Sequence, residues 1–238
     1  MLLAEPSKVY YYTTDKNIDN FKNLKVKFDH YLQKYGEYEF QAFSDKEVFE
    51  DFLEERDNIV MLSSLHYVKI ARKYNLQALF VAQNKKSIRD TNVIIGKKGA
   101  TLSGTITSAF SEKYTKKLLR KTIGFNTLNV LKVPKEIDAL MSVGYGMSKF
   151  ASVSKSSFRL LQKSNKRLTK GMYILSESDP TYRMLIATNK KNISDKNFMR
   201  IFTTMNRDKK GKDILNILGI DNIVKLNKTH LRELRRVR

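Results

Sequence analysis

The sequence predicts an α/β protein with two Rossmann-like lobes, and three observations lead to this prediction. Strand-like and helix-like segments alternate from Lys8 to Ala82. The polar segment QNKKSIRD interrupts this alternation, and a second α/β order begins near residue 85. The length of 238 residues leaves room for two lobes of ordinary domain size. Each lobe is therefore expected to contain a mostly parallel sheet flanked by helices.

The first lobe is predicted from β-branched and aromatic runs that are separated by segments of helical spacing. A strand is expected at residues 8–13, followed by a helix that stops at Gly36. Ser44 is expected to cap the next helix, and Glu47, three residues on, to complete its capping box. The other elements expected here are strands at residues 38–43, 58–62 and 76–82 and a helix at 65–74.

The second lobe shows the same alternation. Strands are expected at residues 92–96, 104–109, 128–133, 150–154 and 171–178, with helices at 111–123, 135–144 and 157–165. Beyond Asp179-Pro180 we expect a strand at residues 182–187 and helices at 195–207 and 212–219. No short-period repeat interrupts this order, which argues against a solenoid.

The charge balance is strongly basic. The chain has 45 Lys and Arg against 24 Asp and Glu, a formal net charge of +21. Such a positive field concentrates anions, whether small oxyanions, nucleic acid or anionic lipid headgroups. The basic residues are spread along the chain, whereas a nucleic-acid-binding tail would be one concentrated block. The exception, the C-terminal LRELRRVR, is interpreted as a solvated last helical turn.

Composition also excludes several classes of chemistry and of segment. The chain has no cysteine, so it has no disulfide, no thiolate metal site and no thiol nucleophile. The start MLLAEPSKVYYY lacks the basic residues and apolar run of a secretory signal, and no segment approaches the roughly 20 apolar residues of a membrane helix. We therefore expect a soluble chain, with any signal peptide absent from this sequence.

Hydroxyl side chains at two predicted strand-to-helix junctions are candidates for binding an oxyanion. Ser63 and Ser64 precede one helix, and Ser108 and Ser111 precede another. Free backbone N–H groups and the helix dipole both favour an anion at a helix start, and open α/β sheets bind ligands at the carboxyl ends of their strands. Plain N-capping is the alternative role for each pair.

Further candidates lie near these junctions. Tyr12, Thr13 and Thr14 end the first strand and are expected to face a ligand, as is Tyr67 on its helix. Core packing is the alternative for each tyrosine. Lys113 and Lys149 are candidates for neutralising an anion, Lys149 because its surroundings resemble an apolar strand. A solvated surface position is the alternative for Lys113.

No assembled catalytic site is predicted. His30, His66 and His230 are far apart in the sequence and have no metal-ligand spacing, and no Ser stands in a GxSxG turn. Gly144 and Gly146 are not followed by a phosphate-binding motif, so helix termination is their expected role. We therefore expect no enzyme activity, no metal and no cofactor.

Five stretches, taken in order, carry a resemblance to a known family. They are FDHYLQKYG, FSDKEVFEDFL before NIVMLSSLHYVKIAR, TLSGTITSA, DALMSVGYGMSKFASV, and ILSESDPTYRMLIA followed by KKGKDILNILGI. Their order and spacing resemble those of the phosphonate- and phosphate-type substrate-binding proteins of ABC transporters, which are periplasmic binding proteins of type 2. The resemblance covers nearly the whole chain.

The resemblance implies lobe one at residues 1–84 and 186–238, lobe two at 85–185, and a two-strand hinge where the chain crosses between them. It implies a monomer that captures a small anionic ligand, such as a phosphonate, phosphate or phosphite, in a cleft between the lobes. Such a protein delivers its ligand to the membrane permease of an ABC transporter from a periplasmic or extracytoplasmic location. Closure of two lobes would bury a charged ligand away from water.

The chain departs from the family pattern at several positions. Lys149 follows Gly146 where the family commonly has an acidic residue that meets a ligand ammonium, so a ligand with only negative charge is favoured. His66 replaces a frequent Pro. The phosphate turn is matched loosely, by Thr105, Thr107, Ser108 and Ser111.

Two other functions stay open at this stage. One is an extracytoplasmic sensory domain of a signalling receptor with the same fold. The other is a basic nucleic-acid-binding protein, which is weakened because the aromatic residues do not cluster with the basic ones as a stacking platform requires.

Overall fold

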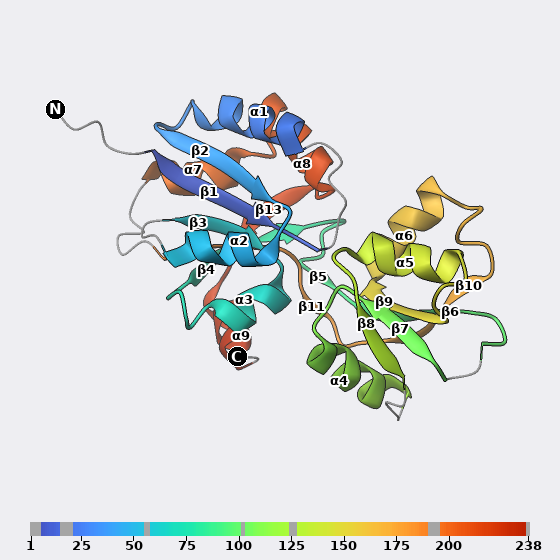
Figure 1. Cartoon of the computed structure of the whole chain (residues 1–238). Coiled ribbons are helices and arrows are strands. Elements are labelled where there is room, and N and C mark those ends of the chain that lie inside the picture. The colour runs from blue at the N-terminus through green and yellow to red at the C-terminus, as the bar shows by residue number, and fades with distance from the viewer. Residues whose placement is uncertain are drawn as a thin grey trace. The chain divides into compact units, whose positions relative to one another are not determined.

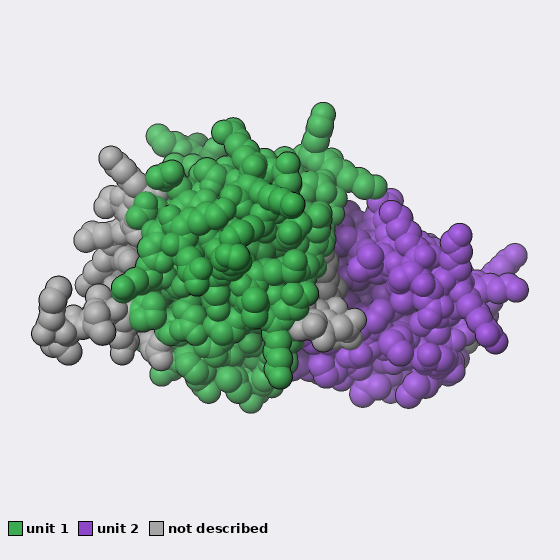
Figure 2. Space-filling model, turned by 90° about the horizontal axis from the view of Figure 1, so that it is seen from above, with its two compact units in different colours: residues 1–13, 18–89, 182–238 green, residues 14–17, 90–181 purple. Residues whose placement is uncertain are grey.

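The chain folds into two compact α/β units in a computed structural model (Figure 1). The structure describes residues 6–14, 21–54, 58–100, 103–123, 128–189 and 196–236. Unit 1 takes in residues 1–13, 18–89 and 182–238, and unit 2 takes in residues 14–17 and 90–181 (Figure 2). The α/β fold class is confirmed.

Unit 1 is built on a six-stranded sheet of order β13-β4-β12-β3-β1-β2. Strand β1 pairs in parallel with β2 and β3, whereas β12 and β13 run antiparallel to their neighbours. The sheet is therefore mixed, with its parallel part at one side. The strands are β1 (Ser7–Tyr12), β2 (Tyr38–Phe43), β3 (Ile59–Leu62), β4 (Gln77–Gln83), β12 (Leu185–Thr188) and β13 (Asn222–Lys225).

Helices cover both faces of this sheet (Figure 1). One face is covered by α1 (Phe21–Leu32), α7 (Lys196–Thr204) and α8 (Lys209–Leu218). The other is covered by α2 (Lys46–Asp51), the 3-10 turn Phe52–Glu54, α3 (Ser64–Ile70) and α9 (Lys228–Arg236). Strand β1 shows the consequence, because Val9 and Tyr11 enter the first core while Tyr10 and Tyr12 enter the second. A strand buried on both faces is apolar throughout, as its sequence predicts.

Unit 2 is built on a five-stranded sheet of order β10-β6-β9-β7-β8. Strand β7 pairs in parallel with both β8 and β9, and β6 runs antiparallel to β9 and β10. Helix α4 packs on one face, and α5 and α6 pack on the other (Figure 1). The strands are β6 (Asn92–Lys97), β7 (Thr105–Ser108), β8 (Asn129–Lys132), β9 (Phe150–Ser154) and β10 (Met172–Glu177), and the helices are α4 (Glu112–Ile123), α5 (Glu136–Gly144) and α6 (Lys155–Ser164).

Two of the crossings between the units are made by short strands, β5 (Arg89–Asp90) and β11 (Thr181–Tyr182), which pair with each other. The Arg89 guanidinium lies 4.4 Å over the ring of Tyr182, and both side chains bind the Glu233 carboxylate of α9. The C-terminal helix therefore holds both crossing strands together on the unit 1 side. The crossings lie at 89/90 and 181/182, several residues from the lobe boundaries at 84/85 and 185/186 that the sequence analysis proposed.

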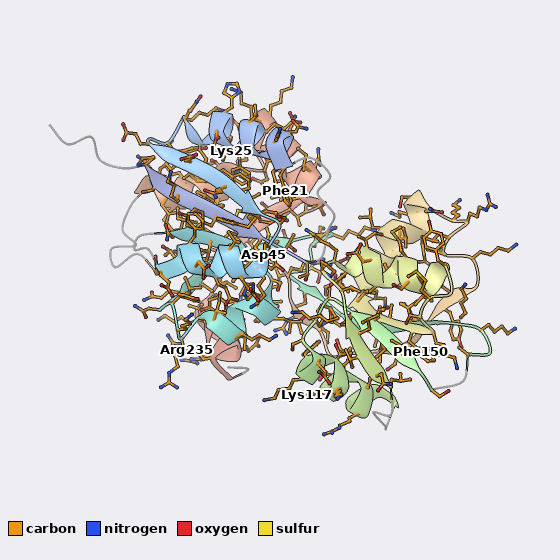
Figure 3. All side chains as sticks on the ribbon, viewed as in Figure 1. Phe21, Lys25, Asp45, Lys117, Phe150 and Arg235 are labelled. Carbon is orange, nitrogen blue, oxygen red and sulfur yellow. The ribbon has the colours of Figure 1, made fainter. Side chains whose placement is uncertain are left out.

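Two local predictions from the sequence were wrong. Asp45, not Ser44, caps α2: its carboxylate accepts the backbone N–H groups of Glu47 at 2.8 Å and Val48 at 2.9 Å (Figure 3). A carboxylate is the stronger acceptor at a helix N-terminus because the dipole adds to its hydrogen bonds. The strand expected at residues 182–187 is divided, because Arg183 and Met184 separate β11 from β12.

Gly211 is required for the packing of α8. A Cβ added there would overlap the backbone carbonyl of Met205, which cannot move aside as a flexible side chain would. We expect Gly211→Ala to lower the free energy of unfolding by about 1–3 kcal/mol, measured by urea denaturation. The exposed neighbour Lys212 gives the control, since Lys212→Ala should stay within about 0.5 kcal/mol of wild type. Equal stability of the two variants would contradict this account of α8.

Candidate anion-binding site

The parallel strands of unit 2 bring three helix starts to one edge of its sheet. Strands β7, β8 and β9 run in the same direction, and each is followed directly by a helix, α4, α5 and α6 respectively. Their carboxyl ends therefore meet at one edge, as do the N-termini of the three helices. Helix N-termini carry positive partial charge and unpaired N–H groups, so this edge favours an anion.

The start of α4 offers the predicted serines and open backbone donors. Ser108 Oγ accepts the N–H of Phe110 at 3.1 Å, and Ser111 Oγ accepts the N–H of Tyr114 at 3.3 Å. Ser111 thus caps α4, and its hydroxyl carries a proton that it can donate. Ser108 is buried, it binds an N–H that precedes the helix, and its hydroxyl donates to the Ser152 carbonyl at 3.4 Å. The first-turn N–H groups of Glu112 and Lys113 have no partner within the described ranges. These groups form a cradle of the kind that binds oxyanions.

Ser152 adds a polar group that the sequence analysis missed. It pairs in register with Ser108 across β7 and β9, and paired residues of neighbouring strands face the same side of a sheet. Ser108 faces α4, since its Oγ lies 3.0 Å from Thr115 Oγ1, so Ser152 faces α4 too. Its Oγ is fully buried and has no hydrogen-bond partner among the described residues. A buried hydroxyl without a partner is costly and indicates a polar guest nearby, such as water or ligand.

At the starts of α5 and α6, other residues of the chain supply acceptors for donor groups. The Glu136 carboxylate accepts the N–H of Ser154 at 2.8 Å and its hydroxyl at 2.7 Å, and Ser154 caps α6. The Glu136 N–H, the first of α5, donates to the Thr14 carbonyl at 3.0 Å. Thr14 is therefore a structural anchor of α5 through its backbone.

Lys135 places a cation at the same edge. It is the residue before α5, it is half-buried, and its ammonium nitrogen is buried. Burial lowers the pKa of Lys135 from its usual value, with Asp138 opposing that effect. Lys135 was not among the predicted site residues, because one Lys among the 45 basic residues gives no signal in the sequence.

The parallel strands of unit 1 bring a second set of predicted residues together. Tyr12 and Thr13 end β1, and Ser63 follows β3, the parallel neighbour of β1. Ser63 caps α3 by accepting the N–H of His66 at 3.2 Å. Thr13 is buried, and the Tyr12 ring stacks on Phe49 with centroids 5.5 Å apart. The prediction that Ser63 caps a helix is confirmed.

Two predicted site residues of unit 1 have structural contacts instead. The Ser64 hydroxyl donates to the backbone carbonyl of Tyr182 and so attaches α3 to the crossing strand β11. Tyr67 is 2% exposed, and its hydroxyl lies 3.2 Å from both the Leu76 carbonyl and the Ala78 N–H. We therefore leave Ser64 and Tyr67 out of the candidate site.

The two predicted lysines differ in position. Lys113 is exposed in the first turn of α4, beside the open N–H groups. Lys149 is exposed too, and it directly precedes β9 (Figure 3 labels the next residue, Phe150). Since β7 and β9 are parallel, Lys149 lies at the amino edge of the sheet. Ser108 and Ser111 lie at the other edge, where the strands end. The apolar setting expected for Lys149 was wrong, because Lys149 is exposed just before the strand, which begins at Phe150 as predicted.

His66 forms a buried cluster beside Tyr12. Its Nε2 lies 2.7 Å from the Glu50 carboxylate, and its ring packs edge-on to Tyr12 with centroids 5.5 Å apart. Burial lowers the pKa of His66, so the neutral imidazole donates its one N–H to Glu50. That hydrogen bond lowers the pKa of Glu50 from 4.5 to about 2, with burial opposing it and Lys46 assisting. The pair is a structural contact within unit 1.

The histidines stay apart in the fold as they do in the sequence. His30 lies against Lys210, and His230 packs on Tyr182. Within the ranges that the structure describes, no three His, Asp or Glu side chains gather as metal ligands, and no helix is long and apolar enough to cross a membrane.

The fold can be compared with solved structures, although no protein-family model and no curated sequence matches the chain. A binding-protein component of an ABC phosphonate transporter from Pseudomonas aeruginosa superposes with a TM-score of 0.78 at 9% identity, over 98% of this chain and 85% of its own. The chain has the type 2 periplasmic-binding-protein fold. PhnD1 from Prochlorococcus marinus, in complex with methylphosphonate, has this fold too, with a TM-score of 0.76 at 14% identity over 98% of this chain and 97% of its own.

The same fold also occurs in a sensor. A histidine kinase sensor domain with similarity to periplasmic binding proteins has a TM-score of 0.58 at 16% identity, over 91% of this chain and 97% of its own. The type 2 periplasmic-binding-protein fold therefore leaves transport and sensing both open.

The contact between His66 and Glu50 leads to a prediction about acid stability. We expect Glu50→Gln to lower the free energy of unfolding at pH 7 by about 1–3 kcal/mol, since the carboxylate is only 19% exposed and accepts a buried N–H. A carboxylate with a lowered pKa stabilises the fold above its unfolded-state pKa and loses this effect as the pH falls. The difference from wild type should therefore shrink between pH 4.5 and about 2.

Urea denaturation at a series of pH values measures this difference. Glu47→Gln is the matched control, because Glu47 lies exposed on the same helix and no side-chain hydrogen bond to its carboxylate is found among the described residues. A Glu50→Gln effect that does not change with pH would contradict the proposed cause.

Proposed function

We propose that this chain is a solute-binding protein that captures a small oxyanion, of the phosphonate, phosphate or phosphite class, and delivers it to the membrane permease of an ABC transporter. The observation that carries the proposal is the start of α4, where Ser108, Ser111 and two open backbone N–H groups lie at the carboxyl edge of the sheet. Backbone N–H groups and hydroxyls at a helix N-terminus match the acceptor oxygens of such a ligand.

The electrostatics of the chain support an anionic ligand. The net charge of +21 attracts anions from solution, and Lys113 and Lys135 lie close to the helix starts of unit 2. A positive surface raises the local concentration and the association rate of a charged ligand. Capture of the ligand between two lobes, by one monomer, stays a prediction from the sequence.

The solved structures of the same fold support this ligand class. The Pseudomonas aeruginosa protein is a component of a phosphonate transporter, and the Prochlorococcus marinus protein was solved with methylphosphonate. A transporter component of this kind works outside the cytoplasm, and we propose an extracytoplasmic location for this chain as well. We further propose that the crossing strands β5 and β11 act as its hinge.

The proposed ligand-binding residues are fewer than the sequence suggested. In unit 2 they are Ser108, Ser111 and Lys113, with Ser152 and Lys135 added. In unit 1 they are Tyr12, Thr13 and Ser63, at the carboxyl ends of β1 and β3. Thr14 is left out because its carbonyl accepts the Glu136 N–H, and Lys149 is left out because it lies at the amino edge of the sheet.

A sensory domain is the second candidate function. It is favoured by the histidine kinase sensor domain that has the same fold. It uses the same ligand chemistry but passes the signal to an attached domain. The neighbouring genes and the full-length gene distinguish the two, since a transporter operon favours delivery and a fused kinase or cyclase favours sensing.

The direct test is a thermal-shift screen, followed by calorimetry on any ligand that responds. The panel contains phosphate, phosphite, methylphosphonate, aminoethylphosphonate and sulfate. We expect a purely anionic tetrahedral ligand to give the largest rise in melting temperature, because a ligand bound only to the native state stabilises it by mass action. A flat response would contradict the proposal. A salt-sensitive response to a mixed-sequence oligonucleotide alone would replace it with nucleic-acid binding.

Ser111 provides the residue-level test. We expect Ser111→Ala to weaken binding of the best panel ligand about tenfold, because one hydrogen bond to a charged group is lost. Ser164→Ala is the control, since Ser164 ends α6 and donates to the Leu160 carbonyl at 3.1 Å. The melting temperature of each variant without ligand separates loss of the cap from loss of the contact. Equal affinity of the two variants would exclude Ser111 from the site.

A further inference from the structure

Glu136 occupies the position that an external anion takes at a helix N-terminus. It is fully buried, and its Oε2 accepts both the backbone N–H and the hydroxyl of Ser154. Ser154 is the N-cap of α6 and accepts the N–H of Ser157 at 3.2 Å. A carboxylate with these partners neutralises the positive end of the helix dipole as a bound oxyanion would.

The first N–H group of α5 and that of α6 are paired as well, whereas the second, that of Ile137 and of Ser156, has no partner among the described residues. The Lys155 N–H, the first of α6, donates to the Thr91 carbonyl at 2.8 Å. The Glu136 N–H, the first of α5, donates to the Thr14 carbonyl. By contrast, the N–H groups of Glu112 and Lys113 at the start of α4 have no partner in the part of the chain that is described. The three helix starts at this edge are therefore not equivalent.

We propose that the Glu136 carboxylate takes the place of a bound anion at the start of α6, a role that we call the resident anion, and that Glu136 is a specificity-determining residue of unit 2. It closes the start of α6 to external anions and leaves the start of α4 as the place where a ligand oxyanion binds. The part that concerns the ligand rests on the proposed function, whereas the filling of α6 by Glu136 is tested without any ligand.

The fixed charge of Glu136 also limits the charge of the ligand. Ser108 pairs with Ser152, and Ser154 lies two residues further along β9, so the Glu136 carboxylate and the start of α4 both lie at the carboxyl edge of the sheet. Like charges at one edge repel, and each further negative charge on the ligand adds to that repulsion. Glu136 thereby disfavours highly charged anions.

The first experiment asks whether an added anion can replace the Glu136 carboxylate. Glu136→Ala leaves a space of carboxylate size beside the donors of Ser154, and it should lower the melting temperature. We expect formate to restore part of this loss, and chloride at the same ionic strength to restore none of it. Glu136→Gln, which fills the space and keeps an acceptor oxygen, should not respond to formate.

Glu54→Ala is the charge-matched control, because Glu54 is 70% exposed and lies in unit 1. If formate stabilised wild type, Glu54→Ala and Glu136→Ala equally, Glu136 would not be a resident anion. If Glu136→Ala does not fold, the second experiment decides, because it uses the nearly isosteric Glu136→Gln.

The second experiment measures binding of inorganic phosphate by calorimetry. Glu136→Gln removes one negative charge from the edge, so it should bind phosphate about fivefold more tightly than wild type. This factor corresponds to the Coulomb repulsion that is lost between the carboxylate and the phosphate, several ångströms apart. Unchanged or weaker binding would overturn the specificity role. Formate rescue without phosphate binding by either protein would reject the ligand class and leave the resident anion intact.

Discussion

Parallel pairing of strands is the constraint from which the candidate site follows. A chain that leaves one strand and enters a parallel neighbour must return along the sheet, and here it returns in helices. Each parallel strand therefore ends where a helix begins, and these junctions collect at one edge. In unit 2 the junctions follow β7, β8 and β9, and in unit 1 they follow β1, β2 and β3. Positive helix ends accumulate at these edges.

Helix starts that are withdrawn from water must find acceptors, and the chain meets this need in two ways. Local caps serve α2 through Asp45 and α3 through Ser63. Acceptors from distant parts of the sequence serve α5 and α6, through the Thr14 carbonyl and the Glu136 carboxylate. Helix α4 has a local cap at Ser111, and its first two N–H groups have no partner among the residues that the structure describes.

The ionisable side chains of unit 1 are used within its own structure. The buried ionisable pair of unit 1, His66 with Glu50, is used within its own core, and the serines near α4 have no histidine beside them to act as a base. The three histidines contact three different partners, Lys210, Glu50 and Tyr182. What the edge of unit 2 supplies is hydrogen-bond donors and positive potential, which are the features that favour an oxyanion at a helix start.

The sequence by itself determined the secondary structure and the fold class, because periodicity and capping are local. Three features depend on neighbours within four residues. They are the aromatic strand run Tyr10–Tyr12, the cap at Ser63 and the start of α4 after Ser111. Local rules failed where two caps competed, at Ser44 and Asp45, and where the strand expected at residues 182–187 is divided at Arg183 and Met184.

Only the tertiary structure decided which helix start is open. Glu136 and Ser154 are 18 residues apart, and Thr14 meets α5 across more than half of the chain. Ser152 faces α4 only because β9 pairs with β7 in one particular register. A hydrogen bond between distant residues exists only once the sheet has fixed their positions, and a local pattern in the sequence holds no record of it.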